Sequence, residues 1–370
     1  MGGAQTRRLS RELDKAKLGS MYFASDNWAG ASAQVANALM NAGNGSVPAY
    51  GADDQTRVAV DWFSEVFEHD VSVFFVATGT AANSLSLASV MKPAGIVLCH
   101  DVAHIACDEA GAPEFLSGGR LVSIPGARGK LTPDALEAAI GRYFPAAVHH
   151  GRPVAVSLSQ STEWGTVYTV EEVTALAAVA HAYGLKVHMD GARLANALAF
   201  LGCQPADITW KAGVDVLSFG GTKNGCWCAE AVVFFNAKKA EDFGYIRKRS
   251  GQLFSKSRFV AAQFQGYFDR GHWLDNAFHA NTMAKRLATG IGQLSTARIL
   301  WEPEANEVFA IWPKAVSARL KAAGAQFYEW NPEGLSDDEK PRDDEDLVRL
   351  VTSFATAAHE VDHFLKALGK

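Results

Sequence analysis

The chain has 370 residues, of which 48% are hydrophobic and 20% charged, and its formal net charge is −5. This length allows two domains with ample core, and the composition is ordinary for a soluble globular protein. A negative balance without a stripe rich in lysine and arginine argues against a nucleic-acid partner. No apolar run approaches the roughly 20 residues that a membrane span requires.

The N-terminus and the cysteines bear on the location of the protein. Arg7, Arg8 and Arg11 are followed by no apolar core, so the first residues do not resemble a secretory signal. The five cysteines, an odd number at scattered spacing, are typical of reduced thiols. We therefore predict a cytoplasmic protein, with residues 1–20 as an N-terminal arm or helix.

Helical patterns and apolar runs alternate from residue 54 to about residue 250. The helical patterns cover 54–69, 80–91, 132–143, 170–183 and 193–201, and the strand-like runs cover 71–77, 96–99, 121–124, 154–158, 185–189, 214–219 and 230–235. Such alternation is typical of βαβ units. It predicts an α/β fold with a mostly parallel seven-stranded sheet flanked by helices.

The pattern changes from about residue 259. Longer helical stretches continue to residue 293 and are followed by apolar runs at 308–311 and 347–351, a helical pattern at 315–323 and a C-terminal helix. This order predicts a smaller α+β domain. We place the large domain at 21–258 and the small C-terminal domain at 259–370.

Reactive side chains follow three of the predicted strands. Gly79 and Thr80 come directly after the run at 71–77 and open a helix, where free backbone N–H groups and a hydroxyl can bind phosphate. Asp190 and Lys223 stand at the ends of the runs 185–189 and 214–219. Because ligands bind at the carboxyl ends of strands in open α/β sheets, these groups should meet there.

A lysine, a carboxylate and a phosphate cradle are together what pyridoxal 5'-phosphate (PLP) requires. Lys223 would form the Schiff base, and Asp190 would keep the pyridine nitrogen of the cofactor protonated. Each residue also has a simpler interpretation. Lys223 could be a surface turn residue, and Asp190 could cap the helix that follows, with Arg193 as its ion-pair partner. The occurrence of all three motifs in this order favours the cofactor site.

These motifs resemble the fold-type I PLP-dependent enzymes, and most closely the low-specificity L-threonine aldolases. The resemblance extends from about residue 21 to the C-terminus. It depends chiefly on the Asp-Gly-Ala-Arg sequence at 190–193 and the Arg-Leu-Val-Thr sequence at 349–352. The segments 23–27 and 49–53 are similar to the start of the family and to its Tyr-Gly-x-Asp segment. The implied fold is that of aspartate aminotransferase.

The resemblance also implies roles for individual residues. His104 would stack on the cofactor ring, and Arg193 would lie near the 3-oxygen of the cofactor and the substrate. Ser25 and Arg349 would hold the α-carboxylate of the substrate, for which a planar guanidinium is well matched. Tyr50 would line the substrate site, although it could instead be a core residue.

The implied reaction is retro-aldol cleavage of threonine, allo-threonine or a related β-hydroxy-α-amino acid such as phenylserine, which yields glycine and an aldehyde. A base must remove the β-hydroxyl proton. Many family members have a histidine where this chain has Glu163. Glu163 could serve if burial raises its pKa, His104 could act through a water molecule, or Glu163 could only line the site.

Some features remain open between two interpretations. Arg349 could form an ion pair with the acidic stretch at 343–346 instead of binding substrate. The resemblance implies a homodimer or homotetramer with sites at the subunit interface. In such an assembly the basic cluster at 247–249 would either reach the cofactor phosphate of the neighbouring subunit or remain a solvated helix face. The same scaffold also supports β-eliminating lyases and aminotransferases.

A zinc-peptidase interpretation is considered and rejected. Residues 359–363 match His-Glu-x-x-His, whose two histidines would share one face of a helix. Position 369, where an extended motif has a third histidine, is Gly369. We expect an exposed amphipathic helix and no metal site.

Overall fold

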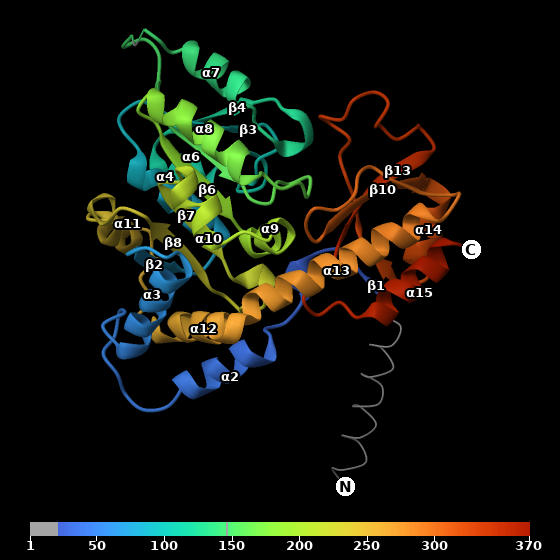
Figure 1. Ribbon diagram of the computed structural model, residues 1–370, viewed down its shortest axis with the longest axis horizontal. Helices are drawn as coiled ribbons and strands as arrows, with labels where there is room; N and C mark the ends of the chain where they lie inside the picture. The colour runs from blue at the N-terminus through green and yellow to red at the C-terminus, as the bar shows by residue number, and fades with distance from the viewer. Residues whose placement is uncertain (1–20, 146) are drawn as a thin grey trace. The chain divides into compact units, whose positions relative to one another are not determined.

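The computed structural model describes residues 21–145 and 147–370, so the predicted arm at 1–20 lies outside the described residues. The chain divides into two compact units, labelled by element in Figure 1. The larger unit is Gly30–Phe278. The smaller unit combines the residues up to Ala29 with His279–Lys370.

A seven-stranded sheet forms the centre of the larger unit. Its spatial order is β2 (Ser72–Val76), β8 (Glu230–Phe234), β7 (Val216–Gly220), β6 (Lys186–Gly191), β5 (Arg152–Ser159), β3 (Gly95–His100) and β4 (Arg120–Ile124). Strands β7, β6, β5, β3 and β4 pair in parallel, and β8 runs antiparallel to both of its neighbours. The predicted sheet, with its continuous apolar strands, is confirmed.

Helices cover both faces of this sheet. The helices of the larger unit are α2 (Ala33–Ala42), α3 (Asp54–Val66), α4 (Gly79–Val90), α5 (His104–Cys107), α6 (Ala112–Ser117), α7 (Pro133–Gly141), α8 (Val170–Ala182), α9 (Leu194–Leu201), α10 (Pro205–Ile208), α11 (Phe243–Arg249) and α12 (Arg258–Phe268). Alternate strand residues bury toward opposite faces, so the sheet separates two cores.

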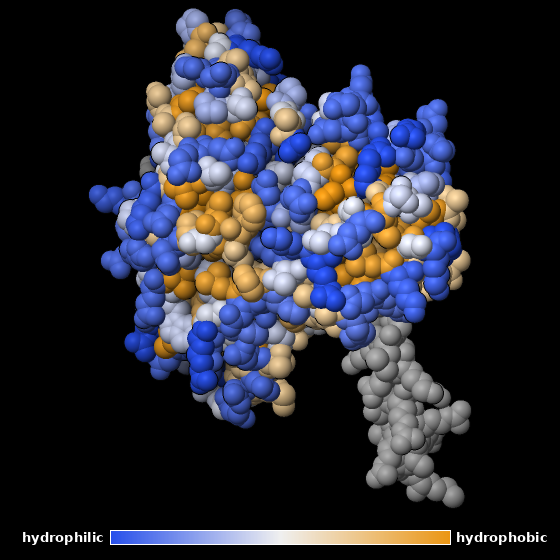
Figure 2. Space-filling model, turned by 45° about the vertical axis from the view of Figure 1, so that its right-hand side comes forward, coloured by the Kyte–Doolittle hydropathy of each residue, from blue (hydrophilic) through white to orange (hydrophobic). Residues whose placement is uncertain are grey.

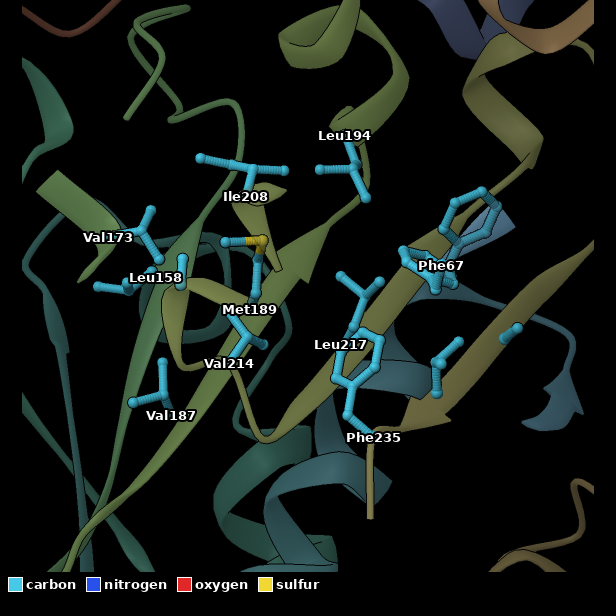
Figure 3. Close-up of a cluster of buried hydrophobic side chains, with 14 of the residues drawn as sticks. Phe67, Leu158, Val173, Val187, Met189, Leu194, Ile208, Val214, Leu217 and Phe235 are labelled. Carbon is cyan, nitrogen blue, oxygen red and sulfur yellow. The ribbon is translucent and has the colours of Figure 1, made fainter. Parts of the chain in front are cut away.

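The larger core joins the sheet to α3, α7, α8, α9 and α12. Figure 3 shows part of it, where Met189 and Leu217 from the strands share a cluster with Leu194 and Ile208 from the helices. On the opposite face, two smaller clusters join the strands to α4, α5 and α11. Helix α4 therefore begins near the strand ends that carry the reactive residues, and it packs along this face of the sheet.

The smaller unit is built on a four-stranded antiparallel sheet in the order β12 (Tyr328–Glu329), β13 (Glu345–Val351), β10 (Glu307–Pro313) and β9 (Arg298–Ile299). A short parallel pair, β1 (Met21–Tyr22) with β11 (Ala325–Gln326), and helices α14 (Lys314–Ala322) and α15 (Ala358–Leu368) complete it. Helix α13 (His272–Gly292) begins in the larger unit and contributes Leu287 and Ile291 to the core of the smaller unit. The predicted α+β character is confirmed.

The two units depart from the domains predicted at 21–258 and 259–370. Residues 21–29 belong to the smaller unit because β1 pairs with β11. Helix α12 belongs to the larger unit because its aromatic face packs there: the rings of Phe264 and Phe268 lie 5.0 and 4.9 Å from the ring of Phe63. Sequence periodicity shows that a helix is amphipathic but does not show which core receives its apolar face.

Hydrophilic and hydrophobic side chains are interspersed on the face that Figure 2 presents. Within residues 21–145 and 147–370, no helix has the length and apolar character needed to cross a membrane. The five cysteines are all free thiols.

Candidate active site

The start of helix α4 provides the predicted phosphate cradle. Thr78 caps the helix, since its Oγ1 accepts a hydrogen bond from the backbone N–H of Ala81 at 3.1 Å. Within the described residues, the N–H groups of Gly79 and Thr80 in the first turn have no such acceptor. A Cβ added at Gly79 would meet no atom within 4 Å, so open space faces these donors. The first turn of α4 could therefore bind an anion, with the positive end of a helix dipole behind it.

Asp190 ends strand β6 as a buried and fully oriented carboxylate, 6% exposed. Its Oδ1 accepts a hydrogen bond from the backbone N–H of Ala192 at 3.0 Å, and its Oδ2 accepts one from Asn83 Nδ2 at 2.7 Å. The N-cap residue of α9 is Arg193, so Asp190 does not cap that helix. The two hydrogen bonds fix the orientation of this carboxyl group at the end of the strand.

Lys223 lies in a tight turn that follows strand β7. The neighbouring Asn224 fixes the turn, because its Nδ2 donates hydrogen bonds to the hydroxyl of Tyr267 at 2.8 Å and to the carbonyl of Trp273 at 2.7 Å. Strand β7 pairs with β6, with Ser218 opposite Asp190. Asp190 and the turn that carries Lys223 therefore lie at the carboxyl ends of neighbouring strands, on the same edge of the sheet.

His104 is the first residue of α5, which follows strand β3. Its Nδ1 lies 2.9 Å from Oε1 of Glu109. This hydrogen bond raises the pKa of His104 against the opposing effect of burial, with a further increase from the charge of Asp190 and a decrease from that of Lys223. Both charges therefore lie close enough to act on this imidazole.

Glu163 contacts the same region in an unexpected way. Its Oε1 accepts hydrogen bonds from the backbone N–H of His104 at 2.7 Å and from the hydroxyl of Ser159 at 2.8 Å. Burial nevertheless raises the pKa of Glu163 to about 7. Among the described residues, its buried Oε2 has no hydrogen-bond partner. The carboxyl is therefore poised to exchange a proton near neutral pH, and it also supports the start of α5.

We expect Glu163→Gln to slow turnover by about 100-fold or more, the scale of a lost general acid or base. The glutamine oxygen can still accept the bond from the His104 N–H, so the affinity for the cofactor should change little. Turnover and the PLP dissociation constant would be measured side by side, with Glu171→Gln on the exposed start of α8 as control. Unchanged turnover would remove Glu163 from the mechanism.

Glu230 is a second buried carboxyl that the sequence analysis did not identify as part of the site. It opens β8 opposite Gly220, and its Oε1 lies 3.4 Å from the backbone nitrogen of Thr222, next to Lys223. Burial raises the pKa of Glu230 to about 7, although Thr222 and the charge of Lys223 oppose the increase. In the sequence, the only indication of its importance was that an acidic residue stands at the start of an otherwise apolar strand.

The raised pKa of Glu230 predicts a pH-dependent stability. Between pH 4.5 and about 7 the folded protein keeps a proton that the unfolded chain loses, so the free energy of unfolding falls as the pH rises through this range. Glu230→Gln cannot ionise. Its stability relative to the wild type should therefore be greater at pH 8 than at pH 5, by on the order of 3 kcal/mol. Urea unfolding at both pH values measures this. An equal difference at both would show that Glu230 titrates normally, and Glu65→Gln at an exposed site serves as control.

Ser25 and Arg349, predicted to hold the substrate carboxylate, both belong to the smaller unit. Ser25 caps a short 3-10 turn and accepts a hydrogen bond from the Asn27 N–H at 3.1 Å. The guanidinium of Arg349, on β13, lies 4.1 Å from the ring centre of Trp330 and 3.6 Å from Oε1 of Glu307. Glu307 is thus a carboxylate neighbour of Arg349.

Tyr50 is 54% exposed, so the interpretation as a core residue is wrong. Its backbone N–H donates to the carbonyl of Ser255 at 2.9 Å, and the Lys248 ammonium lies 5.5 Å from its ring centre. In the same helix, the guanidinium of Arg247 packs over the ring of Phe74 at 5.4 Å, and burial lowers its pKa. Arg247 is therefore not part of a fully solvated helix face.

The segment 359–363 forms part of helix α15 with its two histidines exposed, which confirms the expected exposed amphipathic helix. Asp362 in this segment forms an ion pair with Arg286 at 2.7 Å. No group of three or more possible metal ligands occurs within the part of the chain that the structure describes.

The mostly parallel seven-stranded sheet flanked by helices, with a smaller domain built on an antiparallel sheet, is the fold of the fold-type I PLP-dependent enzymes. Residues 22–314 match the family of beta-eliminating lyases. The chain is 44% identical to the low-specificity L-threonine aldolase of a Pseudomonas species over 311 residues, 84% of this chain and 89% of that protein. It is 45% identical to that of Pseudomonas aeruginosa over 317 residues, 85% of this chain and 91% of that protein.

A solved structure of Leishmania major threonine aldolase superposes with a TM-score of 0.86 at 27% identity, covering 94% of this chain and 98% of that chain. The chain therefore belongs to the beta-eliminating lyase family and, within it, to the low-specificity L-threonine aldolases.

Proposed function

We propose that this protein is a PLP-dependent carbon–carbon lyase that cleaves a β-hydroxy-α-amino acid into glycine and an aldehyde. Threonine, allo-threonine and phenylserine are the candidate substrates. The observation that carries the proposal is the fixed Asp190 carboxylate beside the Lys223 turn at the ends of paired strands. The aldolase activity named for the relatives supports the choice of reaction.

The residues present fit the cofactor. The open first turn of α4 would hold its phosphate through Gly79 and Thr80, Asp190 would face its ring nitrogen, and Lys223 would hold its aldehyde carbon covalently. His104 would lie against the ring and Arg193 near the 3-oxygen. When bound, PLP withdraws electrons from the α-carbon of an amino acid.

The protein's own residues would orient the substrate and move its proton. The planar guanidinium of Arg349 matches a carboxylate, with Ser25 as a second donor and with Arg193 and Tyr50 also in the substrate site. Holding the carboxylate fixes which bond of the α-carbon stands perpendicular to the ring. In an aldolase this must be the bond to the β-carbon.

Removal of the β-hydroxyl proton needs a base with an atom that is not already engaged in a hydrogen bond. Glu163 offers a buried Oε2 without a partner in the described chain and a pKa of about 7. His104 commits Nδ1 to Glu109, which leaves only Nε2 for a proton transfer through water. These contacts support Glu163 as the base, with His104 as the alternative.

The family model, which is that of beta-eliminating lyases, makes β-elimination the second candidate reaction. An elimination would release a keto acid and ammonia, whereas an aldolase releases glycine and an aldehyde. An aminotransferase would need a keto acid as amino-group acceptor. The products from one substrate therefore separate the three reactions.

The decisive experiment uses the purified protein. We expect a yellow enzyme whose visible absorption is lost on treatment with borohydride. The reduced cofactor should then remain covalently attached to Lys223 as a label. A panel of threo and erythro β-hydroxy-amino acids should release glycine and an aldehyde without a keto acid. Absence of the label would refute the cofactor assignment, and keto acid with ammonia would refute the aldolase.

We also propose that the enzyme is a homodimer or homotetramer in the cytoplasm. The exposed Tyr50 and the basic helix α11 that lies beside it are the surface at which a second subunit would complete the site. Light scattering of the purified protein would test the assembly. A monomer with full activity would contradict it.

A further inference from the structure

A continuous chain of polar side chains connects His104 to Asp190. Nδ1 of His104 lies 2.9 Å from Oε1 of Glu109. The same Glu109 oxygen accepts a hydrogen bond from Asn83 Nδ2 at 2.8 Å, and that nitrogen also donates to Oδ2 of Asp190 at 2.7 Å. Asn83, Glu109 and Asp190 are each at most 6% exposed.

The burial of Glu109 calls for a functional explanation. An ionised carboxylate removed from water is costly unless opposite charge or several donors compensate for it. Glu109 has two donors on Oε1, while its Oε2 has no hydrogen-bond partner among the described residues. The imidazole of His104, whose Nδ1 lies 2.9 Å from Oε1 of Glu109, can supply a positive charge when it is protonated.

Asn83 separates two like charges at close range. Its amide nitrogen, with two hydrogens, donates one hydrogen bond to Glu109 and one to Asp190. The amide thus bridges the two carboxyl groups and ties the orientation of one to that of the other.

We propose that Glu109 is a positioning residue, which holds a proton on Nδ1 of His104 and, through Asn83, couples the orientation of that imidazole to the Asp190 carboxylate. This inference deepens the proposed function and rests on it only in placing His104 and Asp190 against the cofactor. The hydrogen bonds themselves require no ligand.

The charged groups around His104 set the expected titration. Glu109 and Asp190 favour its protonated form, Lys223 opposes it, and Glu163 contacts only its backbone N–H. Glu109→Gln keeps an oxygen that can face the ring but removes the charge. The pKa of His104 should then fall by about one unit, which is typical for loss of a neighbouring opposite charge.

The test is an NMR titration of the holoenzyme labelled with carbon-13 at the histidine rings, with His104 assigned by its loss in His104→Asn. In the wild type we expect a pKa above the ordinary 6.5. Glu109→Gln should lower this pKa, whereas Glu114→Gln, the same change at an exposed position of α6, should not. The pKa of His104 in the wild type tests the proposal by itself, so the test can be completed even if a variant fails to fold.

A second measurement addresses the coupling through Asn83. In Glu109→Gln the visible absorption of the bound cofactor should show an altered pH dependence, and in Glu114→Gln it should not. A wild-type His104 pKa at or below 6.5, or equal values in the wild type and Glu109→Gln, would overturn the proposal. Failure of the proposed function would instead appear as absence of the borohydride label on Lys223, a result that leaves the His104 titration measurable.

Discussion

Replacement of Lys223 by alanine should reduce kcat by on the order of 10⁴-fold, the scale on which removal of a covalent catalytic group acts. The amine that would hold the cofactor is lost, whereas the turn that carries it should persist. Its fold depends on Asn224, whose side chain bonds Tyr267 and Trp273. Aldehyde release and borohydride labelling of the variant measure the effect.

A matched control for Lys223→Ala is Lys211→Ala. Lys211 forms ion pairs with Glu68 at 2.9 Å and Asp207 at 3.1 Å on the surface, where such pairs contribute little stability. The control should keep its kcat and its label. A Lys223→Ala enzyme that retains more than a tenth of wild-type turnover would show that this lysine is not the one bound to the cofactor.

Asp190→Asn should lower kcat by about 100-fold, because a charge-assisted hydrogen bond of roughly 3 kcal/mol to the ring nitrogen is lost. The change is nearly isosteric, so the bond from the Ala192 N–H to Oδ1 can be retained. The Asn83 amide, however, then faces a second amide in place of a carboxylate. Turnover and the visible spectrum of the bound cofactor would both be recorded.

Asp215→Asn makes the same chemical change just before β7, at the strand end opposite to Lys223. Asp215 accepts hydrogen bonds from Lys186 Nζ at 2.6 Å and from the Val187 N–H at 2.9 Å. We expect this control to lower the thermal stability and leave kcat unchanged. Equal effects of both variants on kcat would mean that Asp190 acts through stability alone.

The sheet could be predicted because its strands are buried on both faces. Their apolar runs are continuous and separated by amphipathic helices, which is a strong local pattern. The cradle, Asp190 and Lys223 could be proposed as site residues because each lies at or shortly after the end of such a run. Local pattern and position at a strand end were sufficient for these elements.

The connections between these residues could not be predicted from the sequence. Asn83 and Glu109 reach Asp190 and His104 through side-chain hydrogen bonds, and Asn83 is separated from Asp190 by 107 positions. Asn83 was distinguishable only as a polar residue among the buried, mostly apolar positions of α4. Glu109 lies in a connecting segment, where a carboxylate is usually solvated. Such partners depend on tertiary geometry.

Helix α4 has a consequence for the precision of the site. Its first turn carries the N–H groups proposed to bind the phosphate, and its second turn carries the amide that donates a hydrogen bond to Asp190. A single helix would thus position the groups at both ends of the cofactor. A small change in the twist of the sheet would leave the spacing between the backbone of the first turn and the Cα of Asn83 unaltered, because helical geometry determines it.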